Sequence, residues 1–276
     1  MRATVLARGY PAVTTRLPPA DAGTVFVEDR PLGDPRADVA LGPILLGAGI
    51  DDAAEIIRIY TPRPTAAFSR RDSRQPGFRV AVQAADAAGF APVVRGPGGR
   101  LAAYHGGSLV IDHIVRGSDA PSGMVERFEL YSELHARVLG ELGLDARVGE
   151  LDGEYCPGAY SVNVAGVSKV IGSAQRITRD GWMFSTVIQV TGSGSLREVL
   201  RATHQALGYP LDPVTVGTLE DFAPDVTSEA VAGAFRRLYA TGREDAPAVR
   251  LPGAVLAEAR AAAGALRGEL GRFSSP

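Results

Sequence analysis

The stretch YSVNVAGVSKVIGSAQRITRDGWMFSTVIQV, residues 160–190, decides the fold class of this chain. Its β-branched and aromatic residues are concentrated in three runs, at 160–164, 169–177 and 182–190. The pairs Ala165-Gly166 and Asp180-Gly181 separate these runs, and two-residue turns of this kind join antiparallel neighbours. The stretch therefore predicts an antiparallel meander of three strands.

Strands and helices follow one another irregularly along the rest of the chain. Further strand-like runs lie at 55–60, 65–69, 91–94, 101–104 and 108–115. Helical patterns cover 77–89, 122–143, 196–207, 228–239 and 255–270. Because strands and helices do not alternate regularly, the order favours an α+β fold over a doubly wound parallel sheet. We expect a mixed, mainly antiparallel sheet flanked by helices.

Segment 122–143 carries the clearest helical pattern. An apolar stripe with steps of four and three residues runs along it, formed by Met124, Phe128, Tyr131, His135, Val138 and Leu142. Ser122 can cap the start of this helix, and Gly143 can end it. The stripe is expected to face a core, which makes His135 a structural residue.

The chain divides most simply into one domain with two extensions. Residues 1–38 are rich in Pro, Arg and Asp without a sustained period, and we expect an irregular N-terminal arm there. Residues 39–250 are expected to form the domain, and residues 251–276 a C-terminal helix. No internal repeat is present in the sequence.

Composition excludes several classes of protein. The 276 residues are 45% hydrophobic with a formal net charge of -2, so neither nucleic acid nor an anionic membrane surface is an expected partner. No apolar run approaches the ~18 residues of a membrane span, and residues 1–15 lack the pattern of an export signal. One cysteine cannot form an internal disulfide. We expect a cytoplasmic protein.

Cysteine and lysine each occur once, and the two residues are close in sequence. Cys156 is the only cysteine, and Lys169, 13 residues later, is the only lysine. Cys156 lies in a loop between glycines and a proline; it is either a small buried hydrophobe or a nucleophile whose pKa a nearby cation lowers. Lys169 is either a surface residue at a strand end or an ammonium placed beside a reacting carbonyl.

A glycine-rich turn at 95–100, RGPGGR, could present backbone N–H groups to an anion or oxyanion. It matches neither a P-loop nor a dinucleotide fingerprint. His105 lies near this turn and is the one acid–base candidate among four histidines. No pair of histidines has the spacing of a zinc site, so we expect no metal.

Two separated segments resemble the biotin/lipoate protein ligase superfamily. They are VVRGPGGRLAAYH at 93–105 and KVIGSAQR at 169–176. Two further segments, CPGAY at 156–160 and FSRRDSRQP at 68–76, are similar to its octanoyltransferase branch. The likeness covers about residues 40 to 245.

The resemblance implies an acyltransferase that needs no cofactor. Cys156 would carry the acyl group as a thioester, while Lys169 would lower the pKa of the thiol and orient the carbonyl. Substrate-binding residues would be Arg95, Gly98, Gly99, Tyr104, His105, Gly158, Gly172, Ser173 and Ala174. The partners would be lipoyl-domain proteins, namely the glycine-cleavage H protein and the E2 component of 2-oxoacid dehydrogenases, with acyl carrier protein as another possible donor.

Two alternatives stay open on the sequence. One is an ATP-dependent lipoate ligase, in which Lys169 would bind an acyl-adenylate and Cys156 would be incidental. The other is a non-catalytic acyl-binding protein on the same scaffold. The sequence leaves open the acyl donor and whether the group is octanoyl or lipoyl.

Overall fold

The computed structural model describes residues 23–28, 31–50, 52–117 and 123–274. Its strands are β1 (Thr24–Val27), β2 (Glu55–Tyr60), β3 (Thr65–Phe68), β4 (Ala91–Val94), β5 (Ala102–Tyr104), β6 (Ser108–Arg116), β7 (Ala146–Val148), β8 (Val162–Val164), β9 (Ser168–Thr178), β10 (Gly181–Gln189) and β11 (Ala248–Val249). Its helices are α1 (Pro35–Ala48), α2 (Phe78–Ala87), α3 (Met124–Glu141), α4 (Ser193–Leu207), α5 (Ser228–Ala240) and α6 (Gly253–Ser274).

The strands form two sheets. A large sheet has the order β11-β1-β2-β6-β10-β9-β8-β7, and a small sheet has the order β4-β3-β5. β1 pairs in parallel with β2 and β11, and β3 with β4, while the remaining pairs are antiparallel. The expected mixed, mainly antiparallel sheet is confirmed, and so is the meander, now β8-β9-β10.

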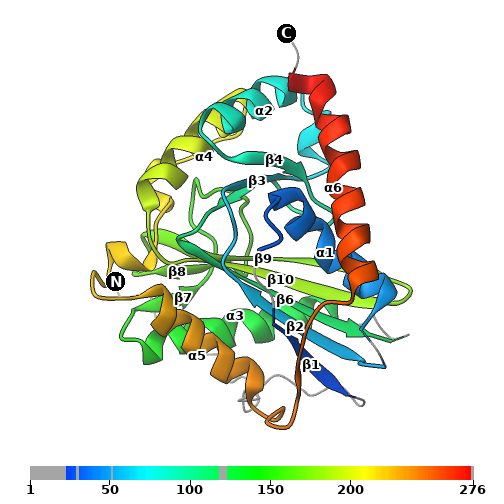
Figure 1. The fold of residues 1–276 in the computed structure, drawn as a ribbon. Helices are drawn as coiled ribbons and strands as arrows, with labels where there is room; N and C mark the ends of the chain where they lie inside the picture. Colours follow the sequence, from blue (N-terminus) through cyan, green and yellow to red (C-terminus); the bar gives the residue numbers. More distant parts are fainter. Residues whose placement is uncertain (1–22, 29–30, 51, 118–122, 275–276) are drawn as a thin grey trace.

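Helices cover both faces of the large sheet. α3 and α5 lie on one face, while α1, α6 and the small sheet lie on the other, with α2 and α4 packed beyond the small sheet (Figure 1). One core joins α3 and α5 to the large sheet, and another joins α2 and α4 to the small sheet. No helix in the described ranges has both the length and the apolar character that a bilayer crossing requires.

The N-terminal arm is the main correction to the expected organisation. Residues 1–22 lie outside the described part of the chain, but β1 and the start of α1 fall inside the segment expected to be irregular. The Asp34 carboxylate accepts from the Arg36 N–H and Pro35 follows the cap, so a helix start was present in the sequence. α6 occupies most of the segment expected to form a C-terminal helix.

The α3 stripe is confirmed over its central part. Tyr131, His135 and Val138 are buried, and burial lowers the pKa of His135 to about 3. Met124 differs, because its side chain is 46% exposed. The cap expected from Ser122 falls outside the described residues, and Gly143 follows the helix with φ +86°.

A buried charge network joins β1, β2 and β6 to the segment after α5. The Glu55 carboxylate accepts from Thr24, from His113 Nε2 and from two nitrogens of Arg243 at 2.6 and 2.7 Å. The Tyr131 hydroxyl donates to the other ring nitrogen of His113. Burial alone would raise the pKa of Glu55, but the hydrogen bonds from His113 and Arg243 bring it to about 2.

Glu55→Ala should lower the free energy of unfolding by about 3–5 kcal/mol, because it leaves the Arg243 guanidinium buried without its carboxylate. Urea denaturation measures this. Since the pKa of about 2 lies below the ordinary 4.5, the stabilisation is complete above pH 4.5 and is lost as the pH falls toward 2. Asp145→Ala removes an ion pair whose two side chains are 57% exposed, so its stability should stay near wild type. Equal stabilities of the two variants would contradict this role for Glu55.

Candidate active site

A cavity of about 510 Å³ lies where the two sheets approach each other. Strands β6, β9 and β10 of the large sheet, β5 of the small sheet, and helices α1 and α3 contribute to its walls. The turn at 95–99 and the loop at 155–161 complete them. Its inner surface carries aliphatic and aromatic side chains, among them Val39, Tyr60, Tyr104, Val110, Met183 and Val187. The cavity has the size and character of a small-molecule site.

Cys156 lies in the wall of this cavity with an unusual backbone. Its φ is +43°, in the left-handed region that non-glycine residues rarely adopt. The Sγ atom is partly exposed and accepts a hydrogen bond of 3.1 Å from the backbone N–H of Arg100. Strain of this kind is concentrated at functional sites and persists only where the surroundings hold it.

Lys169 supplies that support from β9. Its side chain is buried, and Nζ donates to the carbonyls of Tyr155 and Cys156 at 3.0 and 2.8 Å. A third bond, 3.0 Å long, goes to the Glu154 carboxylate. The ammonium therefore fixes the two peptide groups that flank the strained residue. Its expected electrostatic effect on the thiol stays a prediction.

Glu154 is a functional candidate that the sequence analysis missed. Its buried carboxylate pairs with Lys169 and also accepts from Ser161 Oγ at 2.6 Å and from the Gly158 N–H at 3.2 Å. These bonds tie both ends of the cysteine loop to one point. A glutamate two residues before the cysteine was visible in the sequence, but nothing there showed that it faces the lysine.

Gly172 leaves room for the lysine. A Cβ atom added there would lie 3.2 Å from Lys169 Cε, tighter than ordinary van der Waals contact. The neighbouring Ser173 and Ala174 also line the cavity. The small residues of β9 therefore form the wall beside the ammonium.

The glycine-rich turn closes over the thiol. Gly99 has φ +96°, and a Cβ built on it would lie 2.9 Å from Cys156 Sγ. The Arg95 side chain spans the turn and donates to the Arg100 carbonyl at 3.0 Å, while its Nε finds no hydrogen-bond partner in the described part of the chain. The turn brings both a backbone donor and close contact to the sulfur.

Gly99→Ala should slow the reaction of the Cys156 thiol by about 10-fold or more, because the methyl group must displace the thiol or the turn, and small misplacements of reacting groups are costly. Steady-state rates of that reaction measure this. Gly98→Ala is the matched control, since a Cβ at Gly98 meets no atom within 4 Å. Equal losses in the two variants would mean that the loss does not come from contact between the added methyl group and the sulfur.

The structure brings most of the predicted site residues together. Those that line the cavity are Cys156, Lys169, Arg95, Gly98, Gly99, Tyr104, Gly158, Gly172, Ser173 and Ala174.

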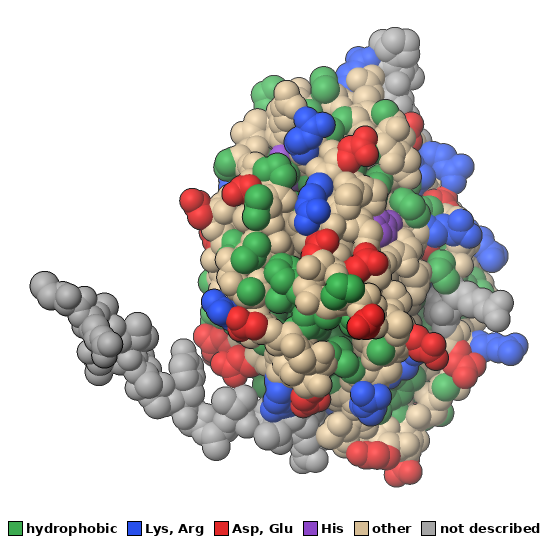
Figure 2. Space-filling model, turned by 90° about the vertical axis from the view of Figure 1, so that its left-hand side faces the viewer, with side chains coloured by type: hydrophobic (Ala, Val, Ile, Leu, Met, Phe, Trp, Pro, Cys, Tyr) green, Lys and Arg blue, Asp and Glu red, His purple; other side chains and the backbone are tan. Residues whose placement is uncertain are grey.

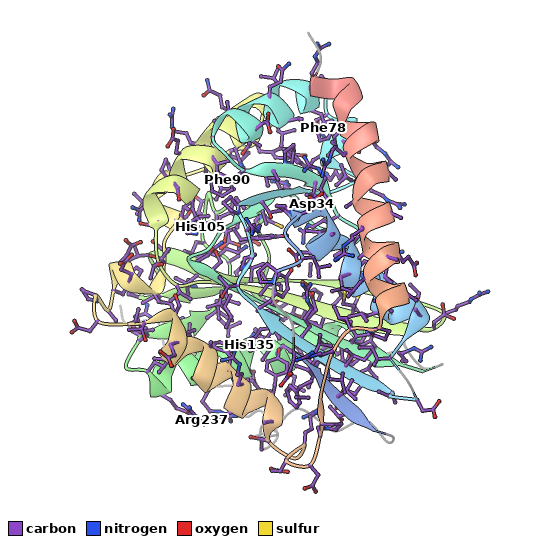
Figure 3. The ribbon with its side chains drawn as sticks, in the orientation of Figure 1. Asp34, Phe78, Phe90, His105, His135 and Arg237 are labelled. Carbon is purple, nitrogen blue, oxygen red and sulfur yellow. The ribbon has the colours of Figure 1, made fainter. Side chains whose placement is uncertain are left out.

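His105 does not line the cavity, which corrects its expected place in the substrate site. Its Nδ1 accepts from the Gly107 N–H at 2.7 Å, and its Nε2 lies 3.1 Å from the Gly192 carbonyl. The ring joins the β5–β6 turn to the start of α4 (Figure 3). Both ring nitrogens are engaged in this structural role.

Two carboxylates that the sequence analysis did not anticipate, Asp38 and Asp112, line the cavity. The buried Arg58 guanidinium donates to Asp38 at 2.6 Å and lies 3.8 Å from Asp112, which accepts from Ser185 at 2.7 Å. Burial raises the pKa of Asp112. Covering these groups with methylenes would remove water without replacing its hydrogen bonds. An alkyl chain is therefore expected to end before this cluster.

A comparison with protein families shows to which family this chain belongs. The model of the lipoyl protein ligase A/B catalytic domain matches residues 34–239, which include the cysteine loop, Lys169 and the glycine-rich turn. The chain belongs to this family. The resemblance drawn from the two sequence segments is thereby confirmed.

Two curated relatives carry the name octanoyl-[GcvH]:protein N-octanoyltransferase. The one from Geobacillus kaustophilus is 29% identical over 181 residues, covering 64% of this chain and 63% of that protein. The one from Exiguobacterium sibiricum is 29% identical over 219 residues, covering 74% of this chain and 78% of that protein. The chain thus spans slightly less than two thirds of the length of the first.

Solved structures of family members share the fold. Lipoate-protein ligase A bound with ATP matches 92% of this chain and 97% of its own, with a TM-score of 0.67 and 18% identity. The putative lipoate protein ligase Ta0514 from T. acidophilum with bound lipoic acid matches 90% and 95%, again with a TM-score of 0.67 and 18% identity. At these identities the likeness shows the fold alone.

Proposed function

We propose that the chain is a cysteine-dependent acyltransferase of protein lipoylation. It transfers an octanoyl or lipoyl group from an acylated carrier protein to Cys156, and then to the ε-amine of a lysine on a lipoyl-carrier protein. The observation that carries this proposal is the Cys156 thiol, held in a strained conformation by Lys169 at the wall of an apolar cavity. The names of the relatives support the octanoyl group and the H protein as a substrate.

The reaction divides into two acyl transfers. In the first, the Cys156 sulfur attacks the carbonyl carbon of the donor's acyl group, and a new C–S bond forms. A thioester donor leaves as a thiol. An acylated H protein, which holds the acyl group as a lysine amide, leaves as the amine after its C–N bond breaks and takes up the proton of the thiol. In the second, the lysine amine attacks the enzyme thioester, an amide bond forms, and Cys156 is released with the proton that the amine loses. The enzyme thioester splits one difficult transfer into two easier ones, and the acyl group is already bonded to its donor, so neither ATP nor a cofactor enters.

The protein supplies position and shape to both steps. The apolar cavity takes the alkyl chain, with the Asp38–Arg58–Asp112 cluster as its limit. Arg95 Nε is a donor that the acyl carbonyl would satisfy. An alkyl chain in the cavity excludes water, which therefore cannot hydrolyse the thioester. This reaction is compatible with the cytoplasm, where a lone cysteine stays reduced.

Transfer assays with three donors test the proposal. Octanoylated H protein, octanoyl-acyl carrier protein and free octanoate are each mixed with an apo-lipoyl domain, with and without ATP, and the acylated domain is measured by mass. We expect transfer from at least one of the two acylated carrier proteins without ATP. Transfer only from free acid and only with ATP would assign the chain to the ligases instead. Acyl binding without transfer from any donor would make it a binding protein.

A further inference from the structure

Cys156 lines two spaces that share the same loop and turn. One is the acyl cavity, and the other is a cleft of about 500 Å³ formed by residues 69–71, 96–100 and 156–157. Gly98, Gly99, Cys156 and Pro157 line both. A thiol that lines both spaces can be reached from the cleft while an alkyl chain fills the cavity.

The cleft is strongly basic. Arg70, Arg71 and Arg100 line it, and its lining contains no carboxylate within the described part of the chain. None of these three guanidinium groups makes an ion pair with a described residue. The nearest acid in the sequence, Asp72, is fully buried and accepts from the Ser69 N–H and the Tyr209 hydroxyl. Its charge is therefore directed into the protein and away from the cleft.

The local charge contrasts with the rest of the molecule. The formal net charge of the chain is -2, and side chains of both signs are interspersed over the face shown in Figure 2. An acidic macromolecule would gain little from the overall charge of this protein. It would be attracted and oriented only by a local basic surface.

We propose that this cleft, defined by Arg70, Arg71 and Arg100, is the docking surface for an acidic surface of the acyl-carrier protein. The inference rests on the proposed function, because it needs an acyl group on Cys156 and a carrier that approaches it. Because the alkyl chain fills the cavity, the carrier body is left to approach from the cleft, the other space that Cys156 lines. Since the donor leaves before the acceptor binds, the same arginines serve both carriers in turn.

Exposure of the arginines favours a protein surface over a small anion. Arg70 and Arg71 are exposed at the mouth of the cleft, while Arg100 is half-buried with its guanidinium 4.8 Å from the centre of the Tyr209 ring. A phosphate site is expected to collect buried, converging donors. Exposed and spread guanidinium groups suit a broad acidic surface whose attraction depends on ionic strength.

The double variant Arg70→Glu/Arg71→Glu tests the proposal in two assays. In the described part of the chain, Arg70 and Arg71 take part in the hydrogen bonds of the loop through backbone atoms alone, so the fold should persist. The first assay measures kcat/KM for acyl transfer from an octanoylated carrier protein. The second measures loading of Cys156 from the small neutral thioester octanoyl-N-acetylcysteamine by intact mass. Arg179→Glu is the control, with a 93% exposed side chain that lines none of the three cavities described in the chain.

We expect the double variant to lose about 10- to 10³-fold in kcat/KM with the carrier, while loading from the small thioester and both rates of Arg179→Glu stay within about twofold of wild type. Added salt should slow the wild-type carrier reaction and have less effect on the double variant.

Three other results would contradict this expectation, each in a different way. A wild-type carrier rate in the double variant would overturn the docking surface alone. Inhibition of small-thioester loading by inorganic phosphate, lost in the double variant, would overturn it in favour of a small-anion site. Failure of the wild type to load from either donor would refute the proposed function itself.

Discussion

Replacing Lys169 with methionine should reduce acyl transfer by about 10²-fold or more. The ammonium holds the carbonyls of Tyr155 and Cys156, and methionine offers them no hydrogen-bond donor. The strained cysteine would then relax, and its sulfur would leave the position set by the Arg100 N–H. Lys169→Arg should also be strongly impaired, because a planar guanidinium cannot direct three bonds from one atom.

Loss of the lysine also leaves Glu154 buried and unpaired, at a cost of about 3–5 kcal/mol in unfolding free energy. Lys169→Met/Glu154→Gln separates this effect from catalysis. It removes both charges and keeps a side-chain oxygen for the Ser161 and Gly158 donors. We expect urea denaturation to show recovered stability while the transfer rate stays low. Recovery of the rate together with stability would mean that Lys169 serves the fold alone.

Cys156→Ala should abolish transfer, with a loss of about 10⁴-fold or more, because no other thiol is present in the chain. Initial rates with a carrier thioester donor and an apo-lipoyl domain measure this loss. Alanine at φ +43° keeps the backbone strain, so the variant should fold like wild type. Cys156→Gly should also be inactive yet more stable by about 0.5–1 kcal/mol, since glycine adopts this conformation without strain. Substantial transfer by Cys156→Ala would remove the cysteine from the mechanism.

The sequence predicted the elements whose pattern is local. β2, β4 and the β8-β9-β10 meander have alternating or continuous apolar runs between turn residues, and they lie close to where that pattern placed them. β1 has four residues and β11 has two, so neither is long enough to show the alternating pattern of a strand, and both were missed. β1 forms by parallel pairing with β2, and β11 by parallel pairing with β1, which are contacts between segments distant in sequence.

Residue types in the sequence predicted part of the site. Residues whose role depends on how the chain folds in three dimensions were not predicted correctly. The single cysteine and the single lysine lie close in sequence, which indicated a joint role. The glycine turn was recognised from its composition. Glu154 was missed because its partner lies 15 residues away, across a loop that folds back. His105 was misplaced because closeness in sequence to the turn does not fix the direction of a ring, which here bonds to Gly192, 87 residues later.

Intact-protein mass spectrometry after incubation with an octanoyl-carrier donor, in the absence of ATP, tests the central claim most directly. The account predicts that wild type gains the mass of one octanoyl group, that neutral hydroxylamine removes it, and that Cys156→Ala gains nothing. Addition of an apo-lipoyl domain should discharge the adduct as the domain becomes acylated. An enzyme that forms no adduct, requires ATP for turnover and stays active as Cys156→Ala would contradict the thioester mechanism.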